Sequence, residues 1–258
     1  MDYLKSFIIG SSGLNTVQHF SWFYLNKEKN KDFPFKLYSI IAPIYFGIMN
    51  MLALYIGKTH KLSLQNRLFI TSIISVIFIF LLNFIITSKK VEYYKNWTSK
   101  DWIYYIIRNG ARHIIIFNLI MYTFEKYFSQ SDIVKAFIIG GSIFSYLGNY
   151  LKVIQLDNQS KITYDYRLFT VVEPFIASIN YIIAAIIIPK LLNISITKSI
   201  LIYSVLIPVL WYYYVNNYDD KKYYKFTKKE LQENFMMFLV YSMIRYNYVL
   251  HYLFTNLK

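Results

Sequence analysis

The sequence predicts an all-α, polytopic integral membrane protein with about eight (seven to eight) transmembrane helices in one domain, residues 1–258. The first observation is composition: 56% of the residues are hydrophobic and only 16% are charged, against roughly 25% charged in a typical soluble domain. The second is a series of long apolar runs, most of them near the ~20 residues that a helix needs to cross ~30 Å of hydrocarbon. Too little polar sequence remains to cover a water-facing surface.

Eight candidate spans follow one another along the chain. The third span is the most apolar, whereas the first is polar on one side because it carries Asn15, Gln18 and His19. Asp101 is a candidate cap for the fourth span, and Thr227 with Glu230 matches a capping box ahead of the eighth. The segment 221–233 is either a short interfacial helix or a charged, solvated loop. The spans are residues 7–25, 35–56, 68–87, 102–124, 133–151, 168–189, 196–215 and 235–254.

The lysines and arginines of the loops predict the orientation. The connections on one side of the predicted bundle hold 16 of these cations, and those on the other side, together with the termini, hold 9. Because cytoplasmic loops are enriched in Lys and Arg, both termini are predicted to lie outside or in a lumen. The first span has no small-residue cleavage pattern, so we expect it to be retained. These features predict an integral membrane location but do not specify the compartment.

The net charge of +14 has an explanation in the membrane. Most cations lie in short connections between apolar runs, where they contact the bilayer and its anionic headgroups. We therefore expect lipid, and other membrane subunits as an alternative, as partners, and no nucleic acid. The excess of Lys over Arg, with abundant Ile, Asn, Tyr and Phe, indicates an AT-rich genome. The sequence contains no cysteine, which excludes disulfides and thiolate chemistry.

Glu173, followed by Pro174, is the sharpest candidate for an ion or proton site. Glu173 lies six residues beyond Arg167, so about 9 Å into the sixth span. Pro174 cannot donate a backbone hydrogen bond and frees a carbonyl one turn earlier. Arg112 should reach a comparable depth, so we expect Arg112 and Glu173 to pair. The alternative is that this pair only fixes two helices.

The fourth span carries two arginines and a histidine. Arg108 and Arg112 are four residues apart and share one helix face, so they are candidates for binding lipid phosphate or an anionic substrate. His113 lies about 100° around the helix and near mid-membrane. It is either a proton carrier or a hydrogen-bonded core histidine, and core histidines are the more common case.

Further pathway candidates lie in the first and eighth spans. Arg245 falls near the midplane, where a lone cation is costly, so it requires a carboxylate, backbone carbonyls or water. Glu173 is the one acid placed well inside a span, because Glu125 lies at the far end of the fourth. His251 in the eighth span and His19 in the first complete the candidates.

No motif names a reaction, a cofactor or a metal. The four histidines are scattered, without HExxH or a histidine box. The sequence has no Walker A loop, no Gly-rich dinucleotide turn and no GxSxG elbow. A retinal protein needs a lysine inside a helix, and every lysine here lies at a span end or in a loop. We therefore predict no cofactor and no metal.

These observations leave three functional hypotheses. The first is a transporter or channel for an ion or a small anionic solute. The others are a membrane-embedded enzyme that acts on lipid and a non-catalytic scaffold or assembly subunit; the balance favours a protein that is not an enzyme. Ile107-Arg108 and Ile244-Arg245, each with a nearby Asn and a later His, suggest a four-plus-four repeat. So few matches in so biased a composition are also expected by chance.

Overall fold

The computed structural model describes residues 2–25, 35–82, 96–142, 166–218 and 225–257, and their side chains outside 14–25, 35–40, 82 and 166–173. The regular structure of the described residues is helical throughout, with no strand, which confirms the all-α prediction. The helices are α1 (Asp2–Leu25), α2 (Phe35–His60), α3 (Leu64–Leu82), α4 (Ser99–Tyr127), α5 (Asp132–Gly140), α7 (Tyr166–Ile182), α8 (Ile188–Leu192), α9 (Ile196–Asn217), α10 (Lys228–Met243) and α11 (His251–Asn256). Two π-helical segments, η3 (Ile183–Ile187) and η4 (Ile244–Leu250), join α7 to α8 and α10 to α11.

Four stretches among the described residues are long and apolar enough to cross a membrane. They are Ile41–His60, Leu64–Leu81, Pro174–Leu192 and Ile196–Asn217, which coincide with the second, third, sixth and seventh predicted spans. The protein therefore has helices suited to an integral membrane protein. The other four spans stay predictions.

Helix starts follow the capping chemistry, with one correction. Thr98, and not Asp101, is the N-cap of α4, because the Asp101 backbone N–H donates to the Thr98 side chain while the Asp101 carboxylate accepts from the Thr98 backbone. Asp101 is thus the third residue of a capping box. Thr227 and Glu230 form the predicted capping box of α10, which begins at Lys228.

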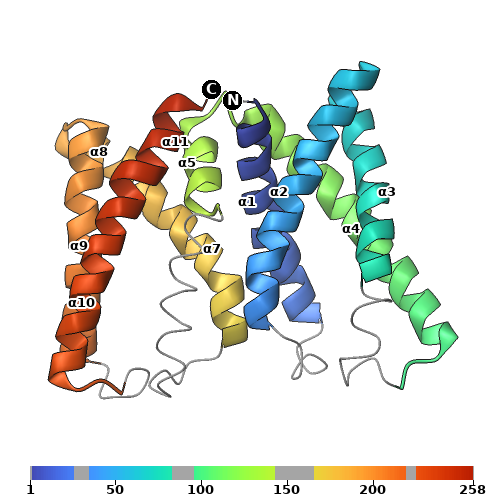
Figure 1. The fold of residues 1–258 in the computed structure, drawn as a ribbon. Helices are drawn as coiled ribbons and strands as arrows, with labels where there is room; N and C mark the ends of the chain where they lie inside the picture. Colours follow the sequence, from blue (N-terminus) through green and yellow to red (C-terminus); the bar gives the residue numbers. More distant parts are fainter. Residues whose placement is uncertain (1, 26–34, 83–95, 143–165, 219–224, 258) are drawn as a thin grey trace.

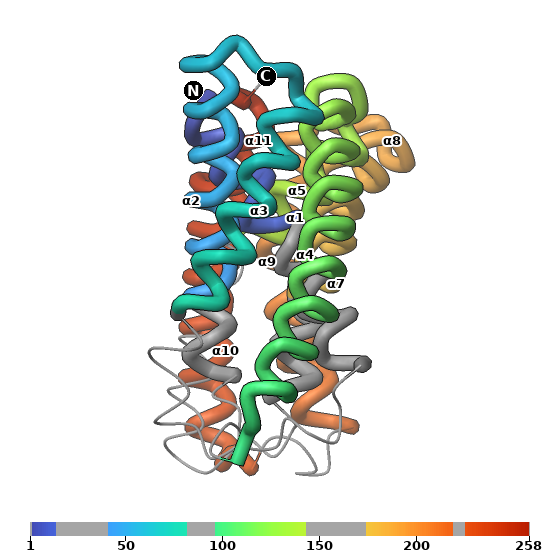
Figure 2. Tube along the Cα trace, turned by 90° about the vertical axis from the view of Figure 1, so that its right-hand side faces the viewer, coloured from blue at the N-terminus to red at the C-terminus, as the bar shows by residue number. Residues whose placement is uncertain are grey.

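The helices form two halves that lie side by side (Figure 1). One half consists of α1–α4 and the other of α5–α11. The pairs α3–α4 and α9–α10 occupy opposite edges of the molecule, with α1, α2, α5 and α7 between them. Figure 2 shows the same bundle from the α3–α4 edge. Both chain ends lie at the same end of the bundle, called here the terminal end.

The two halves repeat the same turn at the terminal end. Lys61 after α2 and Asn193 after α8, 132 positions later, are the described non-glycine residues with positive φ, at 52° and 51°. In both turns the next residue donates its backbone N–H to the carbonyl five positions earlier, at 3.0 and 3.2 Å. Ser63 and Ser195 then accept a backbone N–H with their side chains as α3 and α9 begin, at 3.3 Å in each case. The two turns are structurally equivalent.

The same hydrogen-bond motif joins α3 to α4 in the first half and α9 to η4 in the second. Ser72 of α3 donates to the carbonyl three residues earlier and accepts from the Asn118 amide of α4 at 3.0 Å. Ser204 of α9 does the same, and its partner is Asn247, again at 3.0 Å. Each Asn amide also donates to the carbonyl four residues before it. We call an unbroken helical stretch a rod, whether or not it contains a π-helical segment. The rods Ser99–Tyr127 and Lys228–Asn256 are each 29 residues long, and each follows a capping box.

The first helices of the halves share their sequence. Residues 2–12 (DYLKSFIIGSS) and 132–142 (DIVKAFIIGGS) are identical at seven of eleven positions. Gly10 in this motif packs on the α2 backbone near the Phe46 carbonyl, and Gly140 packs on the α7 backbone near the Ala177 carbonyl. A side chain would not fit at either glycine. The chain therefore consists of two repeated units in the same orientation, and each unit contains four helical rods.

The repeat has a different register from the one suggested by the Ile-Arg steps. Asn118 is equivalent to Asn247, which pairs Arg245 with Ile116 and not with Arg108. The number of positions that separates equivalent residues of the two halves also changes within one rod. Pro43 and Pro174 are 131 positions apart, whereas the turns that end these rods are 132 apart. One residue is thus inserted in the second half, and η3 is the wide-turned segment that accommodates it.

Candidate functional site

A buried carboxylate lies where the four helices of the first half meet near the terminal end. Glu125 of α4 accepts hydrogen bonds at Oε1 from the Asn50 amide of α2, at 2.9 Å, and from the Ser6 hydroxyl of α1, at 3.1 Å. Its Oε2 lies 3.6 Å from the Arg67 guanidinium of α3. The Glu125 and Arg67 side chains are only 11% and 15% exposed. We call these four residues the carboxylate cluster.

Helix geometry explains why the cluster forms. Ser6 and Arg67 lie near the starts of α1 and α3, and Glu125 lies near the end of α4, so all three belong to the terminal end. Asn50 is fixed by a second bond, from its amide to the Ser6 carbonyl at 2.8 Å. Its Oδ1 and the Arg67 Nε are buried and have no hydrogen-bond partner. The cluster therefore keeps one free acceptor and one free donor.

A second polar cluster lies deeper in the same half. His113 Nε2 of α4 is 2.8 Å from the Ser75 hydroxyl of α3. Tyr45 of α2 lies 2.9 Å from the same hydroxyl and donates to the Ser75 carbonyl at 3.0 Å. Phe46 and Phe117 pack on the imidazole. We call Tyr45, Ser75 and His113 the histidine cluster.

Polar side chains on α3 connect the two clusters. Arg67, Thr71, Ser72 and Ser75 lie within eight residues, about 12 Å along a helix, and the last three are fully buried. Asn118 of α4 faces the middle of this stripe through its bond to Ser72. The Thr71 hydroxyl is buried and has no hydrogen-bond partner. We call Arg67, Thr71, Ser72 and Ser75, which lie on α3 between the carboxylate and the imidazole, the polar track.

The second half is an internal control for this track. It retains the contacts that build the fold: the glycine contact, the turn, the caps and the Ser–Asn motif. It does not retain the polar side chains of the two clusters. The residues at the positions of Ser6, Tyr45, Asn50, Arg67, Ser75, His113 and Glu125 are Ala136, Ile176, Tyr181, Ser199, Ile207, Ser242 and Phe254. The Asn50–Glu125 hydrogen bond is replaced by an edge contact between the Tyr181 and Phe254 rings, 6.0 Å apart. The helix arrangement can therefore form without the clusters.

The structure places the predicted residues of α4 at different depths of burial. Arg108 is exposed, beside exposed apolar residues such as Ile107, which suits a side chain that reaches lipid phosphate. Arg112, on the same helix face, is half-buried. His113 is 3% exposed, and its imidazole is hydrogen-bonded to Ser75.

The predicted residues of the eighth span lie in the second half. Arg245 is 6% exposed, and its guanidinium lies 5.3 Å from the Tyr246 ring centroid. Tyr246 contacts the rings of Tyr181 and Tyr203. His251 is half-buried and lies 3.2 Å from the Thr197 hydroxyl. These residues form an aromatic cluster with one buried cation.

Two predicted residues fall outside the described side chains. Glu173 lies on α7 and His19 on α1, but only the helical backbone is described at both positions. The predicted pair of Glu173 with Arg112 therefore stays a prediction.

Sequence reasoning missed the carboxylate cluster. Glu125 was placed at a helix end, yet its side chain points into the bundle and is largely buried. The signal was the number of polar residues at the terminal ends of four consecutive spans, which an up-and-down bundle brings together. No group of three or more His, Cys, Asp or Glu suited to a metal occurs among the described residues.

The comparisons with known proteins add no family. No protein-family model, curated protein or solved structure matches the chain.

Proposed function

We propose that the protein is an integral membrane protein that moves an ion or a small anionic solute, with the carboxylate cluster as the site that binds and releases a proton or an anion. The observation that supports this proposal is Glu125, held by Arg67, Asn50 and Ser6 inside a bundle of apolar helices. The proposal includes the eight predicted spans, which form one membrane domain with both termini outside or in a lumen.

The energetics favour a functional role for this cluster over a purely structural one. An ionisable residue at the centre of a membrane helix costs about 2.5–3.5 kcal/mol or more, and such residues typically mark ion and proton pathways. Arg67 and Glu125 lie one residue beyond the predicted third and fourth spans, so their cost is smaller, but both side chains are largely buried in protein. The second half dispenses with both charges and keeps the helix contacts. The Arg67–Glu125 distance of 3.6 Å is longer than the 2.7–2.9 Å of a tight charge-assisted hydrogen bond. An anion can therefore compete with Glu125 for the Arg67 guanidinium.

The polar track is the proposed route of the proton or anion through the first half. From Glu125 it continues past Thr71 and Ser72 to Ser75 and His113, all of which can donate or accept a hydrogen bond. Glu173 on α7 is the second candidate acid for the same pathway. Separate substitutions at Glu125 and Glu173 distinguish the two.

The test is flux in proteoliposomes under imposed proton and anion gradients. We expect Glu125→Gln to reduce a pH-dependent flux at least tenfold while the protein keeps its thermal unfolding transition. Glu233→Gln is the matched control, because Glu233 is an exposed acid that pairs with Lys229 on the surface of α10. Loss of flux in Glu173→Gln alone would move the site to α7. Equal flux in wild type and Glu125→Gln would refute the role of the cluster.

A further inference from the structure

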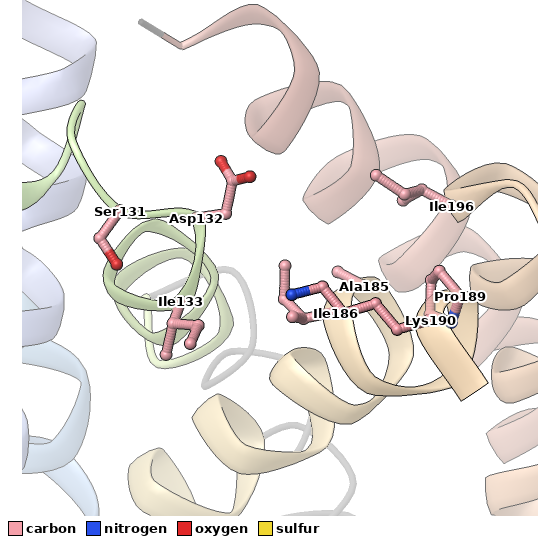
Figure 3. Close-up of a pocket in the computed structure, with 8 residues that line it drawn as sticks. All are labelled: Ser131, Asp132, Ile133, Ala185, Ile186, Pro189, Lys190 and Ile196. Atoms are coloured by element: carbon pink, nitrogen blue, oxygen red, sulfur yellow. The ribbon is translucent and has the colours of Figure 1, made fainter. Parts of the chain in front are cut away.

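A pocket of about 320 Å³ opens at the terminal end of the second half. It lies between the start of α5 and the rod formed by η3 and α8, beside the start of α9 (Figure 3). Asp132 of α5 and Lys190 of α8 face this space from opposite sides, and the lining between them is largely apolar, from Ile133, Ile186, Pro189 and Ile196. No ion pair within 4.0 Å joins Asp132 to Lys190. The pocket thus presents one negative and one positive group that do not neutralise each other.

The first half shows how the equivalent two residues interact there. Asp2 and Lys58 are the equivalent residues in the repeat, and they form a salt bridge at 2.7 Å. Tyr3 also packs against the Lys58 ammonium, 5.3 Å from its ring centroid. Ile133 takes the place of Tyr3 in the second half and lines the pocket. The equivalent Asp and Lys side chains therefore form a salt bridge in the first half, called here the closed half, and form none in the second.

The inserted residue of the second half lies beside the pocket. The offset between the halves changes from 131 to 132 positions within the rod that contains η3, and two residues of η3, Ala185 and Ile186, line the pocket. A π-helical turn is wider than an α-helical turn, and such turns are frequent at functional sites. Lys190 lies three residues after the end of η3, on the side of the inserted residue that leads to the terminal turn.

We propose that this pocket binds a small zwitterion, a primary ammonium joined by a short chain to a phosphate or carboxylate. Asp132 accepts hydrogen bonds from the ammonium, Lys190 binds the acidic group, and the apolar wall contacts the connecting carbons. The position of the pocket at a helix end suits two sources of this chemistry. One is the headgroup of an ethanolamine phospholipid and the other is a free solute. The proposal does not depend on the transport function, because no residue of the carboxylate cluster lines the pocket.

Binding is measured on the full-length purified protein with two probes. The soluble probe is O-phosphoethanolamine, followed by calorimetry in detergent. The lipid probe is phosphatidylethanolamine in phosphatidylcholine nanodiscs, detected by native mass spectrometry. We expect at least one probe to bind, and Asp132→Asn and Lys190→Gln each to weaken that binding about tenfold or more, since each removes a hydrogen bond to a charged group.

The closed half provides the matched control. Asp2→Asn and Lys58→Gln remove the same charges at the equivalent positions, and we expect them to leave binding within twofold of wild type. Binding of the soluble probe assigns a free solute, and binding of the lipid probe alone assigns a headgroup. The proposal is overturned by three results: neither probe binds; Asp132→Asn binds as well as wild type; or inorganic phosphate competes as strongly as O-phosphoethanolamine, which would mean that Asp132 contributes nothing.

Discussion

At the scale of single residues, Glu125 illustrates how context decides the energy of a charge. Its carboxylate receives two neutral hydrogen bonds and one cation, so each of its oxygens has a polar partner. Removing one member of a buried ion pair is costly because the other charge remains without compensation. Glu125 and Arg67 should therefore behave as one energetic unit.

This unit predicts a non-additive double-mutant cycle. Glu125→Leu leaves Arg67 without a carboxylate, and we expect it to lower the free energy of unfolding by about 2–3 kcal/mol, less than the full range for a deeply buried pair. Arg67→Leu should cost a similar amount for the same reason. The double variant should recover at least about 1 kcal/mol of the summed loss. Chemical unfolding in detergent micelles measures all four proteins, and strict additivity would contradict the coupling.

The sequence could not predict this cluster, and the reason is physical. Depth along a predicted span ranks Glu125 low among the ionisable residues, because Glu125 is near the end of α4. Burial, however, depends on which helices cover that end, and Asn50 and Ser6 lie 75 and 119 positions away. His113 was predictable as a hydrogen-bonded histidine, since a buried imidazole needs a partner. The identity of its partner, Ser75 of α3, was not predictable from the sequence.

At the scale of helices, the repeat predicts equal responses at equivalent glycines. A β-carbon at Gly10 would collide with the Phe46 carbonyl of α2, and one at Gly140 would lie 2.8 Å from the Ala177 carbonyl of α7. Backbone oxygens cannot move aside as side chains do. We expect Gly10→Ala and Gly140→Ala each to lower the melting temperature by several degrees.

Gly110→Ala is the matched control for these variants. A β-carbon there meets the Val76 methyl group at 3.1 Å, and that side chain can shift by a few tenths of an ångström. Thermal unfolding of the three variants compares them directly. A large loss at one of the repeat glycines and none at the other would contradict the equivalence of α1–α2 with α5–α7.

Helix starts were more predictable than helix interiors. The Thr227–Glu230 capping box could be predicted because it depends on four adjacent residues. The π-helical segment η3 could not be predicted, since its inserted residue shows only when the two copies of that helix are aligned. The repeat itself was suspected from Ile-Arg steps in the wrong register, although the shared FIIG segments at residues 7–10 and 137–140 carried a stronger signal.

At the scale of the whole molecule, the duplication accounts for the position of the chain ends. A unit of four alternating rods begins and ends on the same side, so two such units in tandem bring both termini to one end, as Figure 1 shows. The second copy then need not carry the same function. Here one copy contains ionisable clusters and a closed Asp2–Lys58 bridge, and the other contains aromatic residues and an open pocket. Duplication followed by divergence is the simplest origin for this pairing.

The membrane orientation is the last prediction, and the absence of native cysteine makes it directly measurable. Single cysteines introduced at Asp2 and Asn256 report the terminal end, and one at Lys225 reports the opposite end, where α10 begins. Because the loops of that opposite end carry most of the cations, we expect it to face the cytoplasm. A membrane-impermeant maleimide applied to intact cells should label the first two variants and should label Lys225→Cys only after permeabilisation. The reverse labelling pattern would show that the protein has the opposite orientation in the membrane. Labelling of Asp2→Cys and Asn256→Cys on different sides would mean that an odd number of rods crosses the bilayer.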